Sequence, residues 1–332
     1  MFFSSQQMLF FCLLISGTFT AISSTSWFLA WIGLELNLMS FIPLISNKTN
    51  RYSSEAALKY FLIQALASAI LVGAAPFHFW LPSIMPLLLA ALLVKLGAAP
   101  FHFWLPSIME GLNWSQAFML MTLQKVAPMF LITHLLSDNL STQIILISSM
   151  LSAVTGAIGG LNQTSLRKVL AFSSISHISW MLAAIYLSET TWIMYFSFYS
   201  LISFSVVVLF NHQQAYYLPQ LAVQSNHSAA PSLISALSLL SLGGLPPFTG
   251  FFPKWVLIES LANAGLIWLL IILIGSALVT LYYYLRVSIT SIILLTTKKK
   301  TCSTPYYSSS LAPIFISMNF FLLLMPSSFA LI

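Results

Sequence analysis

The sequence is poor in charged residues. Of its 332 residues, 5% are Asp, Glu, Lys or Arg, whereas a soluble globular protein carries about 25%. The hydrophobic fraction is 59%. This composition excludes a soluble domain, and we expect a multi-pass membrane protein that has the lipid bilayer, and no nucleic acid, as its surroundings.

Cysteine is also scarce, because Cys12 and Cys302 are the two in the chain. They form no CxxC or Cys/His pattern, which excludes a disulfide scaffold and a cysteine-based metal site. The sequence also lacks a GxGxxG motif after a strand, and therefore lacks a dinucleotide-binding fingerprint.

Long apolar runs are abundant. In hydrocarbon only helices or closed barrels satisfy the backbone, and strand-like alternation is missing, so we predict an all-α polytopic membrane protein. The first run has no basic leader and is followed at once by another apolar run, so we expect it to be retained as a span. Polar and Gly/Pro punctuation predicts about eleven transmembrane helices, centred on residues 7–23, 26–45, 55–76, 86–112, 115–136, 143–160, 168–187, 190–211, 232–262, 264–290 and 312–332.

The basic residues near span ends segregate to one side of this arrangement. Loops after odd-numbered spans contain no Lys or Arg and have Asp138, Glu189 and Glu259 at or near their edges. The positive-inside rule therefore places the N-terminus on the positive side and the C-terminus opposite. The nine basic residues of the positive side are Lys48, Arg51, Lys59, Arg167, Lys168, Arg286, Lys298, Lys299 and Lys300.

Four ionisable residues remain inside the predicted spans: Glu35, Lys95, Lys125 and Lys254. A charge at the bilayer centre costs at least about 2.5–3.5 kcal/mol, and such residues usually mark an ion or proton path. The alternative is that each lysine extends its ammonium group to the interface or forms a static pair with Glu35.

Two of these lysines adjoin Gly/Pro clusters that interrupt helices. LGAAP follows Lys95, and GGLPPFTGFFP precedes Lys254, so we predict broken helices in the fourth and ninth spans. A separation of five spans predicts inverted five-helix repeats, with the paired breaks at a transport site; the alternative is an ordinary kink at each cluster. The predicted parts of this single membrane domain, 1–332, are repeat 1 (about 1–136), repeat 2 (about 143–290) and an extra C-terminal helix (about 312–332).

Lysine suits proton transfer because burial lowers the pKa of an amine while a nearby carboxylate raises it. We therefore predict that Glu35 pairs with Lys95 across helices. His177 lies mid-span among serines in AFSSISHISWM and is a candidate to extend the relay, although a buried histidine is also common as a hydrogen-bonded core residue.

Three runs of this sequence carry a family resemblance: LLVKLGAAPFHFWLPSIMEGLNWSQAFMLMTLQKVAPM, GAIGGLNQTSLRKVLAFSSISHISWML and LSLGGLPPFTGFFPKWVLIESL. They closely resemble the chain 2 family of NADH:ubiquinone oxidoreductase, mitochondrial respiratory complex I, in its insect form. The resemblance implies an antiporter-like, proton-translocating membrane subunit of an H+-translocating NADH:ubiquinone reductase. It covers nearly the whole chain and is weaker over the last fifty residues.

The resemblance also implies roles, partners and location. Glu35 becomes the carboxylate of the Glu/Lys pair, Lys95 the lysine of the first broken helix, Lys125 the central proton carrier, and Lys254 the lysine of the second broken helix. Chains 4L and 4 are the implied neighbours, in the mitochondrial inner membrane with the N-terminus on the matrix side and the C-terminus on the intermembrane-space side. NADH, FMN, iron-sulfur clusters and ubiquinone are implied to be bound by other subunits, so we expect no redox centre in this chain, and bound phospholipids are possible.

The stretch GAAPFHFWLPSIM occurs twice, at 73–85 and 97–109. The family it resembles has one copy, following the lysine of the broken helix. We therefore interpret the copy at 73–85 as a replacement of native residues, and assign no function to Pro76, His78 or Trp80.

Two other functions fit the buried charges. The first is a stand-alone cation/proton antiporter of the same superfamily, which would act without stable neighbours. The second is a purely structural membrane scaffold, in which the buried charges form static pairs.

Overall fold

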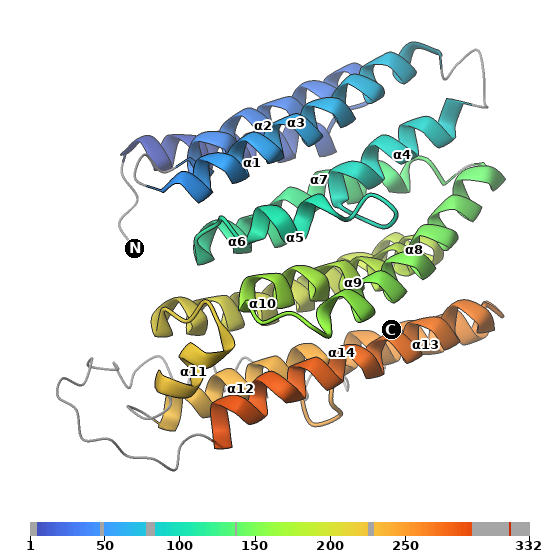
Figure 1. Cartoon of the computed structure of the whole chain (residues 1–332). Helices are drawn as coiled ribbons and strands as arrows, with labels where there is room; N and C mark the ends of the chain where they lie inside the picture. Colours follow the sequence, from blue (N-terminus) through green and yellow to red (C-terminus); the bar gives the residue numbers. More distant parts are fainter. Residues whose placement is uncertain are drawn as a thin grey trace. The chain divides into compact units, whose positions relative to one another are not determined.

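The computed structural model describes residues 5–46, 50–77, 84–136, 138–224, 229–293 and 319, and this part of the chain is helical without strands (Figure 1). The predicted all-α class is therefore confirmed. Lys48, His227, Lys298, Lys299, Lys300, Cys302 and, apart from Asn319, the predicted span 312–332 lie outside the described residues. The chain divides into two compact units, Met1–Ser152 and Ala153–Ile332.

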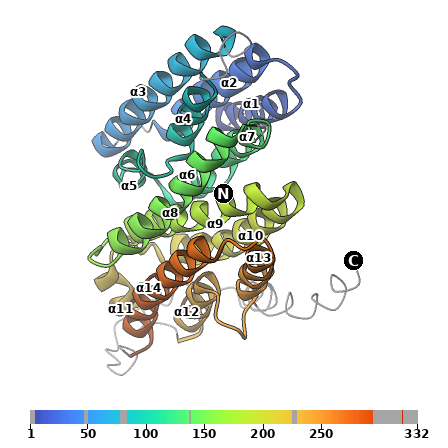
Figure 2. The same ribbon diagram turned by 90° about the vertical axis from the view of Figure 1, so that its right-hand side faces the viewer.

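Unit 1 is built on a long helical hairpin to which a third long helix is added. α1 and α2 approach closely because small residues face each other: a Cβ atom on Gly33 would lie 2.6 Å from the backbone nitrogen of Ala21. α3 packs on α2 and on α4, and α7 contacts α1, α2 and α4 (Figure 2). The helices are α1 (Ser5–Ile22), α2 (Trp27–Ile45), α3 (Arg51–Ala74), the 3-10 turn η1 (Ala75–Phe77), α4 (Met85–Leu96), α5 (Trp104–Met109), α6 (Trp114–Met121), α7 (Leu123–Thr133) and α8 (Asn139–Gly160), whose last residues belong to unit 2.

Unit 2 has α9 at its core, buried along almost its whole length. α10, α13 and α14 pack on α9, and α12 packs on α10 and α14. Its other helices are α9 (Leu166–Leu187), α10 (Glu189–Gln213), α11 (Leu218–Gln224), α12 (Ala229–Gly243), α13 (Phe251–Asn263) and α14 (Ile267–Ile293).

Seven helices of the described part are long and apolar enough to cross a membrane, so the predicted count of eleven is not confirmed. Both predicted breaks are confirmed, between α4 and α5 and between α12 and α13. The predicted span over 115–136 consists of two helices, α6 and α7, separated at Thr122, and the sequence analysis did not predict this interruption. The sequence analysis also missed α11, which is held to the loop before α9 by a hydrogen bond from the Leu218 N–H to the Thr164 carbonyl.

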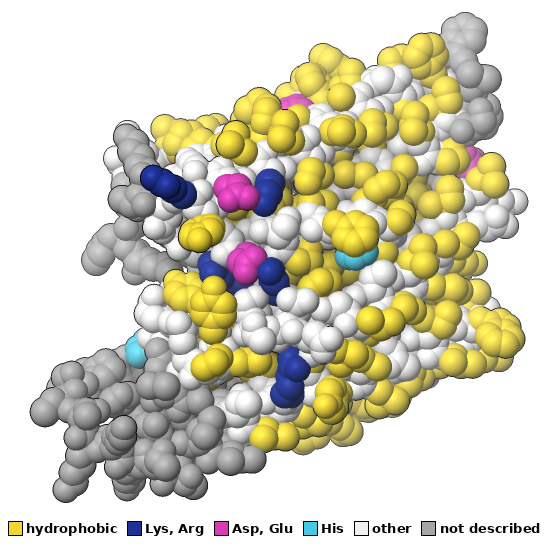
Figure 3. Space-filling model, in the orientation of Figure 1, with side chains coloured by type: hydrophobic (Ala, Val, Ile, Leu, Met, Phe, Trp, Pro, Cys, Tyr) yellow, Lys and Arg dark blue, Asp and Glu magenta, His cyan; other side chains and the backbone are white. Residues whose placement is uncertain are grey.

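The outer face of α3 shows how charge is distributed. Figure 3 shows acidic and basic side chains gathered near one end of this helix, with hydrophobic side chains over much of the rest. Among the described residues, the one salt bridge joins Lys59 to Glu55 at 2.6 Å on this exposed end. This pattern fits a helix whose polar end meets the membrane surface.

Candidate functional site in the lysine-bearing helices

Lys95 lies at the C-terminal end of α4, beside the first break. The helix ends because Gly97 adopts a left-handed conformation (φ 74°), which glycine accepts without steric cost, and its N–H bonds back to the carbonyls of Leu93 and Val94. The indole N–H of Trp104, at the start of α5, also donates to the Val94 carbonyl at 3.0 Å. Lys95 is 6% exposed, so the break places an amine in the interior of unit 1.

Lys125 lies in the first turn of α7, directly after the interruption at Thr122. Thr122 has φ −119° and ψ −78°, far from the usual helical values of about −63° and −42°, and its hydroxyl donates to the Phe118 carbonyl at 2.8 Å. Lys125 is 2% exposed and ranks among the largest fully buried side chains.

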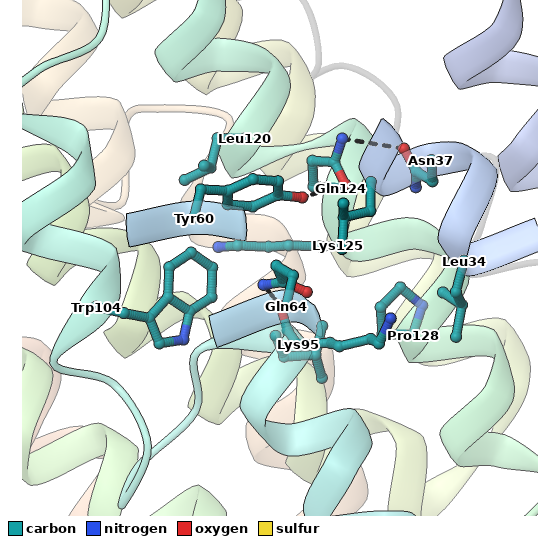
Figure 4. Close-up of a pocket in the computed structure, with 12 residues that line it drawn as sticks. Leu34, Asn37, Tyr60, Gln64, Lys95, Trp104, Leu120, Gln124, Lys125 and Pro128 are labelled. Atoms are coloured by element: carbon teal, nitrogen blue, oxygen red, sulfur yellow. Dashed lines mark hydrogen bonds between the residues drawn. The ribbon is translucent and has the colours of Figure 1, made fainter. Parts of the chain in front are cut away.

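A single cavity of about 10 Å³ is lined by both Lys95 and Lys125. One water molecule needs roughly 10–15 Å³, so this space is close to the smallest that holds one. Figure 4 shows the Lys125 side chain running between Tyr60 and Gln64, with Trp104 beyond. The structure therefore brings two of the predicted lysines, from α4 and α7, to one small polar space.

Four polar residues around this cavity were missed by the sequence analysis: Asn37, Tyr60, Gln64 and Gln124. The Tyr60 hydroxyl donates to Gln124 Oε1 at 3.0 Å, and Gln124 Nε2 donates to Asn37 Oδ1 at 3.0 Å (Figure 4). Gln64 Nε2 donates to the Lys95 carbonyl at 3.4 Å. A signal was present in the sequence, since Tyr60 and Gln64 share one face of an apolar helix at i and i+4 and Gln124 immediately precedes Lys125.

Glu35 does not contact Lys95. It lies on α2 and is partly exposed, and the two side chains interact electrostatically without a salt bridge. Glu35 also acts electrostatically on Tyr60. The structure thus places the carboxylate near the lysine cavity, but it does not show the predicted direct pair.

Lys254 lies on α13, after the second break. It is 7% exposed, and its Nζ atom donates to the carbonyl of Gly243 at 2.8 Å, at the end of α12. Gly244 has φ 78°, and a Cβ atom there would lie 2.9 Å from Lys254 Cδ. The glycine therefore both turns the chain and leaves room for the lysine.

His177 lies in the middle of α9 and is 7% exposed. Its Nδ1 atom is 2.9 Å from the Tyr195 hydroxyl, and its ring centroid is 4.9 Å from that of Tyr199. His177 and Lys254 belong to unit 2, on two helices, α9 and α13, that pack against each other. Within the described residues, no three His, Cys, Asp or Glu side chains are grouped to hold a metal ion.

Comparisons with known proteins match these features. The family model described as NADH:quinone oxidoreductase/Mrp antiporter, TM, matches residues 24–81 and 82–280. The chain is 45% identical over 346 aligned positions to NADH-ubiquinone oxidoreductase chain 2 of Aedes aegypti, covering 94% of this chain and 93% of that protein. It is 44% identical to the protein of the same name from Anopheles gambiae, covering 84% of each.

Solved structures share the fold. A chain of respiratory complex I from Thermus thermophilus superposes with a TM-score of 0.83 at 25% identity, over 97% of this chain and 78% of that one. A chain of the Mrp complex from Dietzia sp. has a TM-score of 0.73 at 18% identity, over 89% of this chain and 65% of that one, and supports the fold alone. The family model and the relatives at 44–45% identity show that the chain belongs to the NADH-ubiquinone oxidoreductase chain 2 family of antiporter-like membrane subunits.

Proposed function

We propose that this chain is a proton-translocating membrane subunit of respiratory complex I, coupling NADH:ubiquinone electron transfer to proton movement through Glu35, Lys95, Lys125, His177 and Lys254. The observation that carries the proposal is the burial of three lysines, 2–7% exposed, each next to an interrupted helix. Keeping amines in an apolar interior is costly, and proton transfer is a function that requires it.

The proposed route in unit 1 passes between Lys95 and Lys125. Both lysines line the same small cavity, and Glu35 acts electrostatically on Lys95. A shift of charge at Glu35 would therefore change how readily Lys95 holds its proton, and a water in the cavity could pass that proton towards Lys125.

The redox chemistry and the neighbours are assigned by the same proposal. We place NADH, FMN, iron-sulfur clusters and ubiquinone in other subunits, with chains 4L and 4 as neighbours and phospholipids against the outer helices. The chain would lie in the mitochondrial inner membrane with its N-terminus on the matrix side. The stand-alone antiporter is less favoured, because the likeness to the Mrp complex concerns the fold alone.

Replacing Lys125 with Met tests the proposal. Lys125→Met removes the titratable amine and keeps an unbranched apolar side chain, so we expect an assembled complex whose proton pumping is reduced. Assembly is read on native gels, and pumping is read as protons moved per NADH oxidised in inverted membrane vesicles. The matched control is Lys59→Met, at an exposed position of α3, which we expect to pump normally. Normal pumping by an assembled Lys125→Met complex would instead support the scaffold alternative.

A further inference from the structure

The turn that carries Lys125 follows an interruption of the helix. The Thr122 N–H donates to the Phe118 carbonyl, four residues back, whereas the Lys125 N–H donates to the Thr122 carbonyl, three residues back. Pro128 lies inside α7 and offers no N–H to the Gln124 carbonyl, four residues earlier. Side-chain contacts with neighbouring helices therefore help to set the orientation of this turn.

Gln124 supplies two such contacts, from the position next to Lys125. Its Oε1 atom accepts the Tyr60 hydroxyl of α3, and its Nε2 atom donates to Asn37 Oδ1 of α2, both at 3.0 Å. Tyr60 and Asn37 are 3% and 2% exposed, so both partners of the Gln124 amide are buried. One amide thus ties α7 to two other helices, as Figure 4 shows.

Helix α3 holds the other lysine through the same face. Gln64, one turn from Tyr60, donates to the Lys95 carbonyl at 3.4 Å. Asn37, Tyr60, Gln64 and Gln124 all line the cavity that Lys95 and Lys125 share. One face of α3 therefore contacts the segments that carry both lysines, through Tyr60 to Gln124 and through Gln64 to the Lys95 carbonyl.

We propose that Gln124 is a positioning residue for proton transfer: its bonds to Tyr60 and Asn37 hold the interrupted turn of α7 so that Lys125 faces the cavity shared with Lys95. This inference rests on the proposed function. A carboxamide suits the task because it donates and accepts hydrogen bonds without ionising, and so it keeps both bonds while the lysines beside it change charge.

The first test is Gln124→Leu in the assembled complex. The expected result is a loss of protons moved per NADH oxidised, down to the level of Lys125→Met at each pH tested, with uncoupled NADH:ubiquinone electron transfer retained. The matched control is Gln116→Leu, which removes a glutamine that is also bonded to α2, at the Leu44 carbonyl, and that does not line the cavity. We expect the control to keep the parental pumping ratio once assembled.

A second variant tests whether Gln124→Leu lowers pumping because Lys125 loses its position or only because buried polar groups lose their hydrogen-bond partners. Gln124→Leu leaves the Tyr60 hydroxyl and the Asn37 amide without their partner, whereas the triple variant Tyr60→Phe, Gln124→Leu, Asn37→Leu removes all three groups together. We expect the triple variant to assemble at least as well as Gln124→Leu and still lose pumping. Where neither assembles, Tyr60→Phe, which deletes one hydroxyl, decides the question, and we expect it to lower the pumping ratio.

Several outcomes would overturn the inference. Normal pumping by Gln124→Leu would show that Gln124 does not position Lys125. The same conclusion would follow if the triple variant recovered pumping together with assembly. If neither of these variants assembled, normal pumping by Tyr60→Phe would lead to the same conclusion. Normal pumping by Lys125→Met would instead reject the proposed function on which the inference rests.

Discussion

The ammonium group of Lys254 caps the C-terminal end of α12 by donating to the Gly243 carbonyl at 2.8 Å. The last carbonyls of a helix lack intrahelical donors and carry partial negative charge, so a cation stabilises them. In the proposed function Lys254 therefore has two tasks, because it holds the helix end at the second break and would also release and regain a proton.

Lys254→Arg separates these two tasks. Arginine keeps the positive charge and the donors needed at the Gly243 carbonyl, but it is not deprotonated in proteins. We expect the complex to assemble and to lose the proton pumping that depends on Lys254, which native gels and vesicle pumping assays measure separately. Lys254→Met should do worse in assembly, because it leaves the carbonyl without its donor at a cost of about 1–3 kcal/mol. Retained pumping in Lys254→Arg would exclude proton release from this residue.

Gly244→Ala tests the space beside Lys254. The added Cβ would lie 2.9 Å from Lys254 Cδ and 3.0 Å from Nζ, in a backbone conformation (φ 78°) that disfavours alanine. We expect a loss of stability of about 1–2 kcal/mol and a lower pumping ratio. Gly275→Ala in α14 is the control, because nothing lies within 4 Å of its added Cβ. Thermal unfolding of the purified complex measures both, and equal effects of the two variants would contradict the prediction.

Tyr195→Phe tests whether the hydroxyl at 2.9 Å orients the His177 ring. The change removes the hydrogen bond and keeps the ring that stacks near Trp180. If His177 relays protons in one orientation, Tyr195→Phe and His177→Phe should lower pumping by similar amounts, and the double variant should be no worse than either. Additive losses in the double variant would indicate independent roles. Tyr217→Phe, at an exposed tyrosine, should leave pumping unchanged.

Trp104→Phe tests the first break. It keeps an aromatic ring but removes the N–H that donates to the Val94 carbonyl at 3.0 Å. We expect a loss of about 1 kcal/mol in stability, together with a smaller pumping ratio because the end of α4 carries Lys95. Trp268→Phe is the control, since that side chain is 80% exposed. An unchanged melting temperature for Trp104→Phe would show that this hydrogen bond does not hold the break.

Much of the fold could be predicted because hydropathy and the backbone preferences of glycine and proline depend mainly on the local sequence. Apolar runs predicted the helices, and the glycines and prolines near Lys95 and Lys254 predicted the breaks between α4 and α5 and between α12 and α13. The break at Thr122 could not be predicted, since no Gly or Pro marks it and its geometry depends on packing around α6 and α7. The pair of Glu35 with Lys95 was predicted because Glu35 is the one acid in the middle of a predicted span, but the structure shows no salt bridge between the two side chains.

The repeated stretch shows that local sequence alone does not determine the backbone conformation. Gly73 lies inside α3, whereas its counterpart Gly97 is left-handed and ends α4; Met85 begins a helix, whereas Met109 ends one. Identical residues take different conformations because the helices around each copy differ.

The sequence by itself determined that the chain is a helical membrane protein with a few costly charges, because the free energy of placing each residue in lipid depends mainly on that residue. Only the tertiary structure decided which of those charges meet and what holds them. The bonds from Gln124 to Tyr60 and Asn37 join residues 64 and 87 positions apart, so they exist only once three helices have packed.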